Sequence, residues 1–390
     1  MAVTKHPTHT KGKLNMKLGS LFSGSGSFEL AGLFCGIKPV WNSEVCGFAV
    51  AVTDKRLPDT KQLGDVTKIN GSGIEPVDII TFGSPCQDLS IAGKQAGIHN
   101  GTRSSLFFEA IRIIKEMRNA TANQFPRFAV WENVRNSLSS HNGADFRAVL
   151  QAFVEAAGSE AVIPMPKGKW PSAGAIVGDG FSVAWKVLDA QYAGVAQRRK
   201  RVYVVADFGG ECADEILGDC ASGYGDSETR IKAWQAFAGY TGRSAERDCG
   251  VVYDARGNGD GLICPTITGD HENRITDYTA VLVQKNEDRH YFMMQRFDEY
   301  KEGDVASTLK QRDYKDNTDL IVEQHDRQWN VRRLTETECL SLQGLPKWWC
   351  DGVKGASATR IYQLAGNAVA LPCVIDVLGR IVDYTCRGLL

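Results

Sequence analysis

The sequence predicts an α/β fold, in which strands and helices alternate around a mostly parallel sheet, with a second, mostly β domain inserted late in the chain. Three observations support this prediction. Short apolar runs rich in β-branched residues have the length of buried strands, and amphipathic helical segments follow them. A Gly-rich turn joins the first strand to the first helix. From Gly209 onward the alternation gives way to Gly, Asp, Thr and short strand-like pieces.

Length and composition describe a globular chain with room for two domains. Its 390 residues are 43% hydrophobic and 23% charged, and the net charge of −1 argues against nonspecific coating of nucleic acid. No apolar run approaches a membrane span, and the N-terminus lacks a signal-peptide core. The eleven cysteines form no C-x-x-C pair and the seven histidines are scattered. We therefore expect no metal site, no disulfide framework and a cytoplasmic location.

The first strand and its turn are typical of the opening of a nucleotide-binding fold. We expect a strand over residues 18–22, followed by a turn over residues 23–28 and then a helix. Gly24 and Gly26 permit tight turning and close approach of a ligand to the backbone, and the helix N-terminus directs N–H groups towards it.

Two acidic residues follow at positions that suit a nucleoside. The strand predicted over residues 39–42 ends next to Glu44, about where nucleotide folds place an acid for ribose hydroxyls. Asp65, after another turn, could accept from an adenine amine. Ordinary helix capping explains either acid equally well when each is taken alone.

A cysteine stands at the end of the next predicted strand. The apolar run 77–82 breaks at Gly83 and delivers Pro85, Cys86 and Gln87 into a loop. In open parallel sheets, catalytic groups lie just past the carboxyl ends of strands, so Cys86 is placed to react. A buried structural cysteine is the alternative that this stretch alone leaves open.

The following segments continue the alternation. Residues 88–102 are polar and Gly-rich, which is typical of a mobile loop that closes over a site. Glu132 comes directly after a predicted strand, and the basic run 198–201 is either a nucleic-acid contact or a solvated surface. We expect helices over 106–117 and 144–157, strands over 127–131, 183–188 and 202–206, and a loop over 164–180.

The chain divides into four predicted segments. Thr266-Ile267 and Thr276-Asp277 recur as Thr308-Leu309 and Thr318-Asp319, which indicates an internal repeat of about 253–283 and 295–323. Near the end, Thr335 and Glu338 have the spacing of a capping box for a helix over 334–342, and a second helix follows over 372–382. The predicted segments are an N-terminal arm, 1–14; a catalytic domain, 15–208; an inserted domain, 209–330; and a return to the catalytic domain, 331–390.

These segments together resemble the DNA (cytosine-5)-methyltransferases. The motifs stand in the family's order and cover residues 18–207 and 332–374. Family members usually carry Asp at Ser20, Gly at Ser27 and Pro at Ala196. The motifs that carry the resemblance are Phe22-Ser-Gly-Ser-Gly26, Glu44, Asp65-Val66, Pro85-Cys86-Gln87, Glu132-Asn133-Val134, Gln197-x-Arg199-x-Arg201, Arg333-Leu-Thr-x-x-Glu338 with Gln343-Gly-Leu-Pro346, and Gly366-Asn367-Ala368-Val369.

The resemblance implies a Rossmann-like, S-adenosylmethionine-dependent methyltransferase sheet with an inserted target-recognition domain. It implies sequence-specific methylation of cytosine C5 in double-stranded DNA, with S-adenosyl-L-homocysteine as the second product. By resemblance, the cofactor is surrounded by Phe22, Gly24, Gly26, Glu44, Asp65, Val66, Pro85, Leu106, Asn367 and Val369. The DNA side is formed by Gln87, Ser90 and Asn133, and the reaction by Cys86, Glu132, Arg199 and Arg201.

The chemistry explains these residue types. Cytosine C5 becomes a carbon nucleophile once a thiolate has added to C6, and Cys86 has that role. Glu132 would assist at N3 if burial keeps its proton, and Arg201, with Arg199 nearby, would contact the pyrimidine oxygen. Because C6 is inaccessible inside a duplex, the base must first be flipped out.

Two other functions fit the same motifs. One is methylation of cytosine in tRNA, and the other is a catalytically silent DNA-binding relative. The large inserted domain favours duplex DNA, and an intact Cys86, Glu132 and Arg201 favours an active enzyme. We expect a monomer in the bacterial cytoplasm, encoded by a host or a phage, with any companion restriction endonuclease beyond the reach of one sequence.

Overall fold

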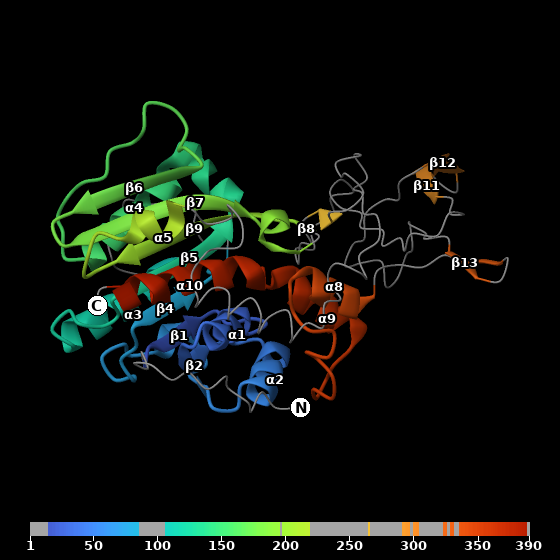
Figure 1. Cartoon of the computed structure of the whole chain (residues 1–390), viewed down its shortest axis with the longest axis horizontal. Coiled ribbons are helices and arrows are strands. Elements are labelled where there is room, and N and C mark those ends of the chain that lie inside the picture. The colour runs from blue at the N-terminus through green and yellow to red at the C-terminus, as the bar shows by residue number, and fades with distance from the viewer. Residues whose placement is uncertain are drawn as a thin grey trace. The chain divides into compact units, whose positions relative to one another are not determined.

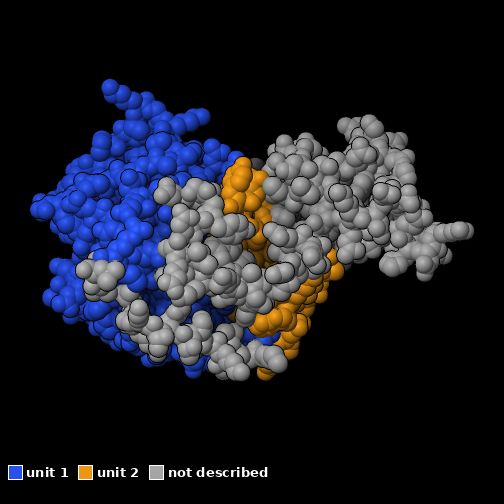
Figure 2. Space-filling view, in the orientation of Figure 1, with its two compact units in different colours: residues 1–188, 200–234, 373–390 blue, residues 189–199, 235–372 orange. Residues whose placement is uncertain are grey.

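The structure is a computed structural model that describes residues 15–85, 106–195, 197–218, 264–265, 291–296, 299–303, 323–325, 328–330 and 335–387. The chain forms two compact units, which Figure 2 shows in two colours. Unit 1 comprises residues 1–188, 200–234 and 373–390, and unit 2 comprises residues 189–199 and 235–372.

Unit 1 is organised around an eight-stranded mixed sheet (Figure 1). Strands β1, β2, β3, β4 and β5 pair in parallel, whereas β5 pairs with β9, and β6 with β7, antiparallel. In spatial order the strands are β3 (Lys61–Gln62), β2 (Lys38–Ser43), β1 (Lys17–Leu21), β4 (Ile79–Phe82), β5 (Phe128–Val134), β9 (Lys200–Asp207), β7 (Phe181–Asp189) and β6 (Ala173–Gly178).

Helices cover the sheet because its central strands are apolar on both faces. All four residues of β4 are buried, as the continuous apolar run predicted. Ile80 and Phe82 face one core, where the rings of Phe107 and Phe153 pack around Phe82. Among the described residues of unit 1 the helices are α1 (Ser27–Phe34), α2 (Gly47–Arg56), α3 (Leu106–Ala120), α4 (Ala144–Ala156), α5 (Ala213–Gly218) and, from residue 373, α10 (Leu371–Arg387), with short 3-10 turns η1 (Val66–Lys68), η3 (Arg135–Leu138) and η4 (Ser140–Gly143).

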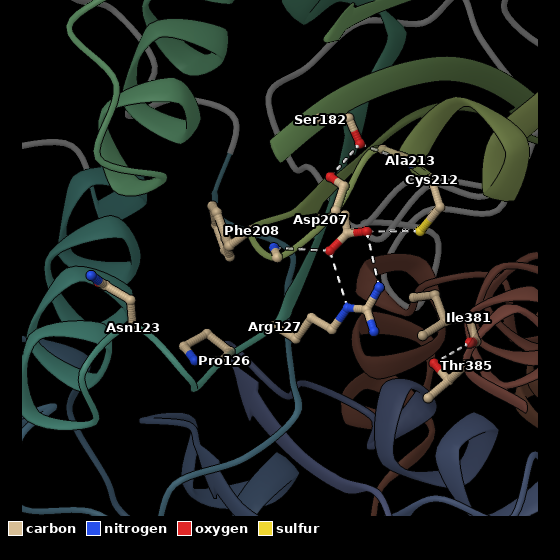
Figure 3. A network of polar contacts seen from close by, with 12 residues as sticks. Asn123, Pro126, Arg127, Ser182, Asp207, Phe208, Cys212, Ala213, Ile381 and Thr385 are labelled. Carbon is tan, nitrogen blue, oxygen red and sulfur yellow. Dashed lines mark hydrogen bonds and ion pairs between the residues drawn. The ribbon is translucent and has the colours of Figure 1, made fainter. Parts of the chain in front are cut away.

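A buried carboxylate at the end of β9 links several elements of unit 1 through hydrogen bonds. Asp207 is fully buried and accepts from Arg127, at distances of 3.2 Å to Nε and 3.4 Å to Nη2, and from the Cys212 thiol at 2.9 Å (Figure 3). Burial, followed by the contact with Asp207, raises the pKa of that thiol. The Arg127 guanidinium also lies 5.9 Å from the ring centre of Tyr384, so the network reaches the C-terminal helix α10.

The described part of unit 2 contains short strands and the helices α8 and α9. Strand β8 (Gln197–Arg198), after the turn η5 (Ala190–Ala193), pairs in parallel with β10 (Cys264–Pro265). The hairpins are β11 (Tyr291–Arg296) with β12 (Glu299–Gly303) and β13 (Glu323–His325) with β14 (Gln328–Asn330), and the helices are α8 (Glu336–Leu342) and α9 (Ala358–Asn367).

The predicted capping box at the start of α8 is confirmed. The Thr335 hydroxyl accepts from the Glu338 N–H at 3.2 Å, and the Glu338 carboxylate accepts from the Thr335 N–H at 2.7 Å. The helix ends before Gly344, which has a φ of 81°. A Cβ at that position would lie 2.7 Å from the ring of Pro372, so the turn requires glycine.

Two sequence expectations differ from the structure. Residues 164–180, expected as a loop, contain the edge strand β6, in which exposed and half-buried residues alternate. Gly174 is required there, because a Cβ would lie 2.3 Å from the indole of Trp185. Within the mostly parallel sheet that was expected, β5, which carries Glu132, and β9, which carries Arg201, pair antiparallel.

The compact units also divide the chain differently from the predicted domains. Helices α8 and α9 belong to unit 2, and the return to unit 1 begins at Cys373. The predicted boundaries at 209 and 331 stay predictions. The Thr-containing positions that define the repeat lie outside the described residues, as does the expected N-terminal arm.

The described part of the chain has neither a cluster of metal-binding side chains nor a single membrane-spanning helix. No three or more His, Cys, Asp and Glu side chains gather there as a metal ion would require. No single described helix is long and apolar enough to cross a membrane, and α9 with α10 satisfies the length and composition test only as a bent pair.

Candidate active site

The turn between β1 and α1 has an unusual backbone. Phe22, Gly24 and Gly26 all have positive φ, of 56°, 53° and 80°. For Phe22 this conformation costs about 1–2 kcal/mol, so its surroundings must hold it in place. Ser23 supplies part of that support, because its N–H donates to the Ser43 carbonyl at 3.0 Å and its carbonyl accepts from the Gly26 N–H at 2.9 Å.

Glu44 fastens this turn to the end of β2. Its Oε2 accepts from the Gly24 N–H, and its Oε1 accepts from the N–H groups of Val45 and Cys46, each at 2.8 Å. A carboxylate offers about four acceptor positions, so one remains for a ligand hydroxyl. Val45, which the sequence reasoning missed, exposes 73% of its surface beside this carboxylate. Its sequence position, directly after the predicted ribose acceptor Glu44, is the signal that could have identified it.

Asp65 caps the short turn η1, which was one of the two roles predicted for it. Its Oδ1 accepts from the Thr67 N–H at 3.0 Å and from the Thr67 hydroxyl at 2.8 Å. The N–H bond, followed by the hydroxyl bond, lowers the pKa of Asp65, so the group is an acceptor at neutral pH. Oδ2 has no bond to a described residue and points to a second role as the predicted amine acceptor.

Arg112 on α3 holds the segment that follows Asp65, a contact that the sequence did not indicate. Its Nη2 donates to the carbonyl of the buried Val66 at 3.1 Å, and its Nη1 donates to the Ile69 carbonyl at 2.8 Å. Glu109 and Glu116 on the same helix hold the guanidinium at 2.8 Å. Leu106, a predicted cofactor contact, is the half-buried first residue of α3.

Strand β5 fixes the chain just before Pro85 and Cys86. The Trp131 indole N–H donates to the Ser84 hydroxyl at 3.1 Å, and the Asn133 amide donates to the Ser84 carbonyl at 3.0 Å. The Asn133 amide oxygen also accepts from the Val134 N–H at 2.8 Å. Asn133 is 3% exposed, so the structure gives it a positioning role. Its predicted contact with DNA stays a prediction.

Glu132 and Arg201 meet at the same edge of the sheet. In the antiparallel register Glu132 lies opposite Tyr203 and Val134 lies opposite Arg201, so Glu132 and Arg201 are diagonal neighbours on one face. Arg201 Nε lies 3.2 Å from Glu132 Oε1, and both side chains are about nine-tenths buried. A Cβ built on Gly83 would lie 3.5 Å from Glu132 Oε2, so the carboxyl lies beside the exit of β4.

Unit 2 holds the remaining described site residues. Arg199 is buried, and its Nη2 donates to the carbonyls of Gly366 and Ala368, at 3.3 and 2.7 Å. These carbonyls flank Asn367, which is exposed at the end of α9, and Val369 is half-buried. Arg199 therefore positions the predicted cofactor motif, and its predicted place beside the base stays a prediction.

The predicted nucleophile is not among the described residues. Cys86, Gln87 and Ser90 lie outside them, as does the expected loop over 88–102, whereas Pro85 is described and exposed. Within unit 1 the structure thus brings together Gly24 with Glu44, and Glu132 with Arg201 and the exit of β4.

A sheet with a Gly-rich turn after β1 and carboxylates after β2 and β3 is typical of α/β enzymes that bind a nucleoside-containing cofactor. The sequence model described as C-5 cytosine-specific DNA methylase matches residues 16–157 and 176–383. The chain therefore belongs to the C-5 cytosine-specific DNA methylase family, whose enzymes transfer a methyl group to cytosine in DNA. This confirms the predicted family and reaction class.

The individual relatives are also methyltransferases. The type II methyltransferase M1.ScrFI of Lactococcus lactis subsp. cremoris is 25% identical over 97% of this chain and 80% of its own length. A protein of Escherichia phage P1 named DNA N-6-adenine-methyltransferase is 32% identical over 78% of this chain, and the chain spans 41% of that protein. The type II methyltransferase M.HhaI of Haemophilus parahaemolyticus is 31% identical over 47% of each chain.

Solved structures confirm the predicted fold. The S. pombe Dnmt2 methyltransferase aligns over 96% of this chain and 99% of its own, with a TM-score of 0.54 and 14% identity. An Entamoeba histolytica methyltransferase gives the same TM-score over 95% of this chain and 99% of its own, at 13% identity. At these identities the likeness concerns the fold alone.

Proposed function

We propose that this protein methylates C5 of a flipped-out cytosine in a specific sequence of double-stranded DNA, with S-adenosylmethionine as methyl donor. The observation that carries this proposal is the place of Glu132. Its carboxyl lies against Gly83 and Arg201, where β4 ends and the chain continues to Pro85 and Cys86. A carboxyl group and a guanidinium thus lie beside the segment that leads to the proposed nucleophile, which supports this proposal.

The residues of unit 1 fit the proposed cofactor. Glu44 keeps an acceptor position for a ribose hydroxyl, Val45 offers an apolar surface to adenine, and Asp65 Oδ2 can accept from the adenine amine. Phe22, Gly24 and Gly26 form the turn that faces the remainder of the ligand, and Val66, Pro85 and Leu106 complete this set. Asn367 and Val369 in unit 2 are proposed as further contacts. When bound, the cofactor supplies an electrophilic methyl group for C5.

Cys86 is proposed to start the reaction by forming a bond from its thiolate sulfur to C6. A cysteine thiol with a pKa near ~8.5 is only partly ionised at neutral pH. The addition is therefore faster if the cytosine ring is itself activated towards the thiolate. Electrons from the C5–C6 double bond then move to C5. After methylation, C5 loses its proton to water, and the sulfur–C6 bond breaks as the double bond re-forms and the thiolate leaves.

Glu132 is proposed to hold a proton at N3 of the base while Cys86 adds to C6. The neutralised ring accepts the sulfur more readily because negative charge no longer accumulates on it. Arg201, whose Nε lies 3.2 Å from Glu132 Oε1 and whose Nη1 donates to the Lys200 carbonyl, is proposed to orient the carboxyl and to offer Nη2 to the pyrimidine oxygen. Arg199 is proposed to act through its support of residues 366–368.

DNA contacts are proposed for Gln87, Ser90 and Asn133, and base reading for the inserted region 209–330. The bacterial and phage relatives support action on DNA inside a bacterial cell. We propose that the protein works as a monomer without a metal ion.

Transfer of a labelled methyl group tests this function. Purified protein is mixed with radiolabelled S-adenosylmethionine and either duplex DNA or tRNA, and the product is digested to nucleosides. We expect 5-methylcytosine in DNA, and bisulfite sequencing then gives the recognition sequence. Label only in tRNA, or only as N6-methyladenine, would overturn the proposal.

Two substitutions test the assigned chemistry. Cys86→Ala should abolish transfer, and Glu132→Gln should lower kcat by about 10²–10⁴-fold, the usual contribution of a positioned acid. DNA in which 5-fluorocytosine replaces cytosine should trap a covalent complex with the wild type and none with Cys86→Ala, because C5 then has no proton to lose. Full methylation by Cys86→Ala would refute the mechanism.

A further inference from the structure

A fully buried carboxyl group lies beneath the Gly-rich turn. Glu29 on α1 is 0% exposed, and every residue of that helix from Ser27 to Gly32 is buried. Its neighbours are the buried polar side chains of Ser20 on β1, Ser23 in the turn and Asn42 on β2. Because an enclosed carboxyl is costly where an apolar side chain would pack, this position calls for a specific role.

Glu29 is bonded directly to the turn. The Ser23 hydroxyl donates to Glu29 Oε1 and also lies 3.4 Å from the Ser20 hydroxyl. Ser23 in turn bonds through its backbone to Ser43 and Gly26. The carboxyl therefore anchors a residue that lies between two left-handed backbone positions, Phe22 and Gly24.

The pocket lacks one hydrogen-bond donor. Glu29 Oε2 and Asn42 Oδ1 are both acceptor atoms, and neither has a partner among the described residues. A protonated Glu29 carboxyl would bring a donor into this pocket of acceptor atoms. Burial raises the pKa of Glu29 to about 7, and the nearby Glu44 carboxylate raises it further, against the opposing effect of the Ser23 and Asn42 side chains. The proton is therefore retained close to neutral pH.

We infer that Glu29 is a positioning residue of the cofactor site, whose protonated carboxyl holds Ser23 and thereby keeps residues 22–26 in the conformation that binds the cofactor. This inference rests on the proposed function of that turn. The family resemblance leads us to expect an acid on β1 at position 20, where this chain has Ser20. The acid of this pocket instead comes from α1.

The proposal predicts a pH dependence of cofactor binding. Of the charged groups on the elements around α1, Glu44 is the one that acts on Glu29, while Lys17 and Lys38 stand at the opposite ends of β1 and β2. Ionisation of Glu29 removes the donor and places a charge in the pocket, so the binding-competent fraction falls above about pH 7. At pH 8.5 that fraction is about 1/30, so the Kd should be about 30-fold weaker than at pH 6.

Calorimetric titration with S-adenosyl-L-homocysteine between pH 6 and 8.5 tests this. The full-length wild type should show the 30-fold weakening. Glu29→Gln is neutral at every pH and keeps one acceptor and one donor, so its Kd should stay flat at the wild-type value for pH 6. Asp145→Asn is the matched control, because it removes a buried carboxyl on α4, and it should keep the wild-type slope. Titration of the ligand's own amine is common to all three proteins and cancels.

The outcomes separate the two proposals. A wild type that fails to bind S-adenosyl-L-homocysteine at any pH would refute the proposed function. A wild type that binds, but with the same slope as Glu29→Gln or with no slope, would overturn the role of Glu29 alone. A Glu29→Gln protein that is folded by circular dichroism and binds more than tenfold more weakly than wild type at pH 6 would overturn it too.

Discussion

Replacing Glu29 with Gln should stabilise the protein at alkaline pH. The pKa of Glu29 rises from 4.5 to about 7 on folding. Because the folded state holds the proton more tightly than the unfolded state, stability is lost as the pH rises from about 4.5 to 7, and the loss is complete above that range. A shift of this size corresponds to about 3 kcal/mol. The full value applies because the group is completely buried.

Urea unfolding of both proteins, followed by tryptophan fluorescence at pH 5 and pH 8, measures this effect. The difference in unfolding free energy between Glu29→Gln and the wild type should grow by about 2–3 kcal/mol in favour of the variant from pH 5 to pH 8. Any difference in packing between the amide and the carboxyl is the same at both pH values. It therefore cancels when the free-energy difference at pH 5 is subtracted from that at pH 8. If the two proteins lose stability in parallel over this range, Glu29 does not titrate as the structure indicates.

Three other substitutions follow from contacts described above. Arg112→Met removes the donors to two carbonyls after Asp65 and should weaken S-adenosyl-L-homocysteine binding about tenfold by calorimetry, since each bond contributes about 1 kcal/mol; unchanged affinity would contradict this. Arg127→Met leaves the buried carboxylate of Asp207 without its cation and should cost about 3 kcal/mol in urea unfolding at pH 7, and a cost below 1 kcal/mol would show that the pair is not needed. Thr335→Ala should lower the unfolding free energy by about 1 kcal/mol through loss of the capping box, whereas Thr335→Ser should be nearly neutral.

The sequence predicted the parallel half of the sheet well, because its strands are buried on both faces. The run that became β4 contains only apolar and β-branched residues between a polar start and Gly83, so its length and type were evident. Strand β6 was missed because it lies on the sheet edge, where half its residues are exposed and Gly and Ala outnumber β-branched residues. The direction of β9 was also hidden, since an apolar run has the same pattern in either direction.

The candidate site was predictable where a residue stands next to a strand end. Glu44 directly follows β2, and Glu132, expected directly after a strand, lies two residues before the end of β5. Arg112 was not predictable, because a charged residue on the outside of an amphipathic helix normally faces solvent. Glu29 did carry a signal, since an acid within Ser27–Phe34 interrupts an otherwise apolar and small-residue helix. Only the fold shows that this acid has no route to solvent.

Unit 1 cannot complete its fold during synthesis until helix α10 has been made. The Cys35 thiol donates to the carbonyl of Ile375 at 3.5 Å, and Val374 and Leu378 are completely buried. About 150 residues separate α5 from this helix, which the ribosome takes about 8–30 s to add. During that interval the surface of α1 that receives α10 stays uncovered. Nascent chains should therefore need chaperone protection until the last segment emerges, and variants truncated before Cys373 should aggregate.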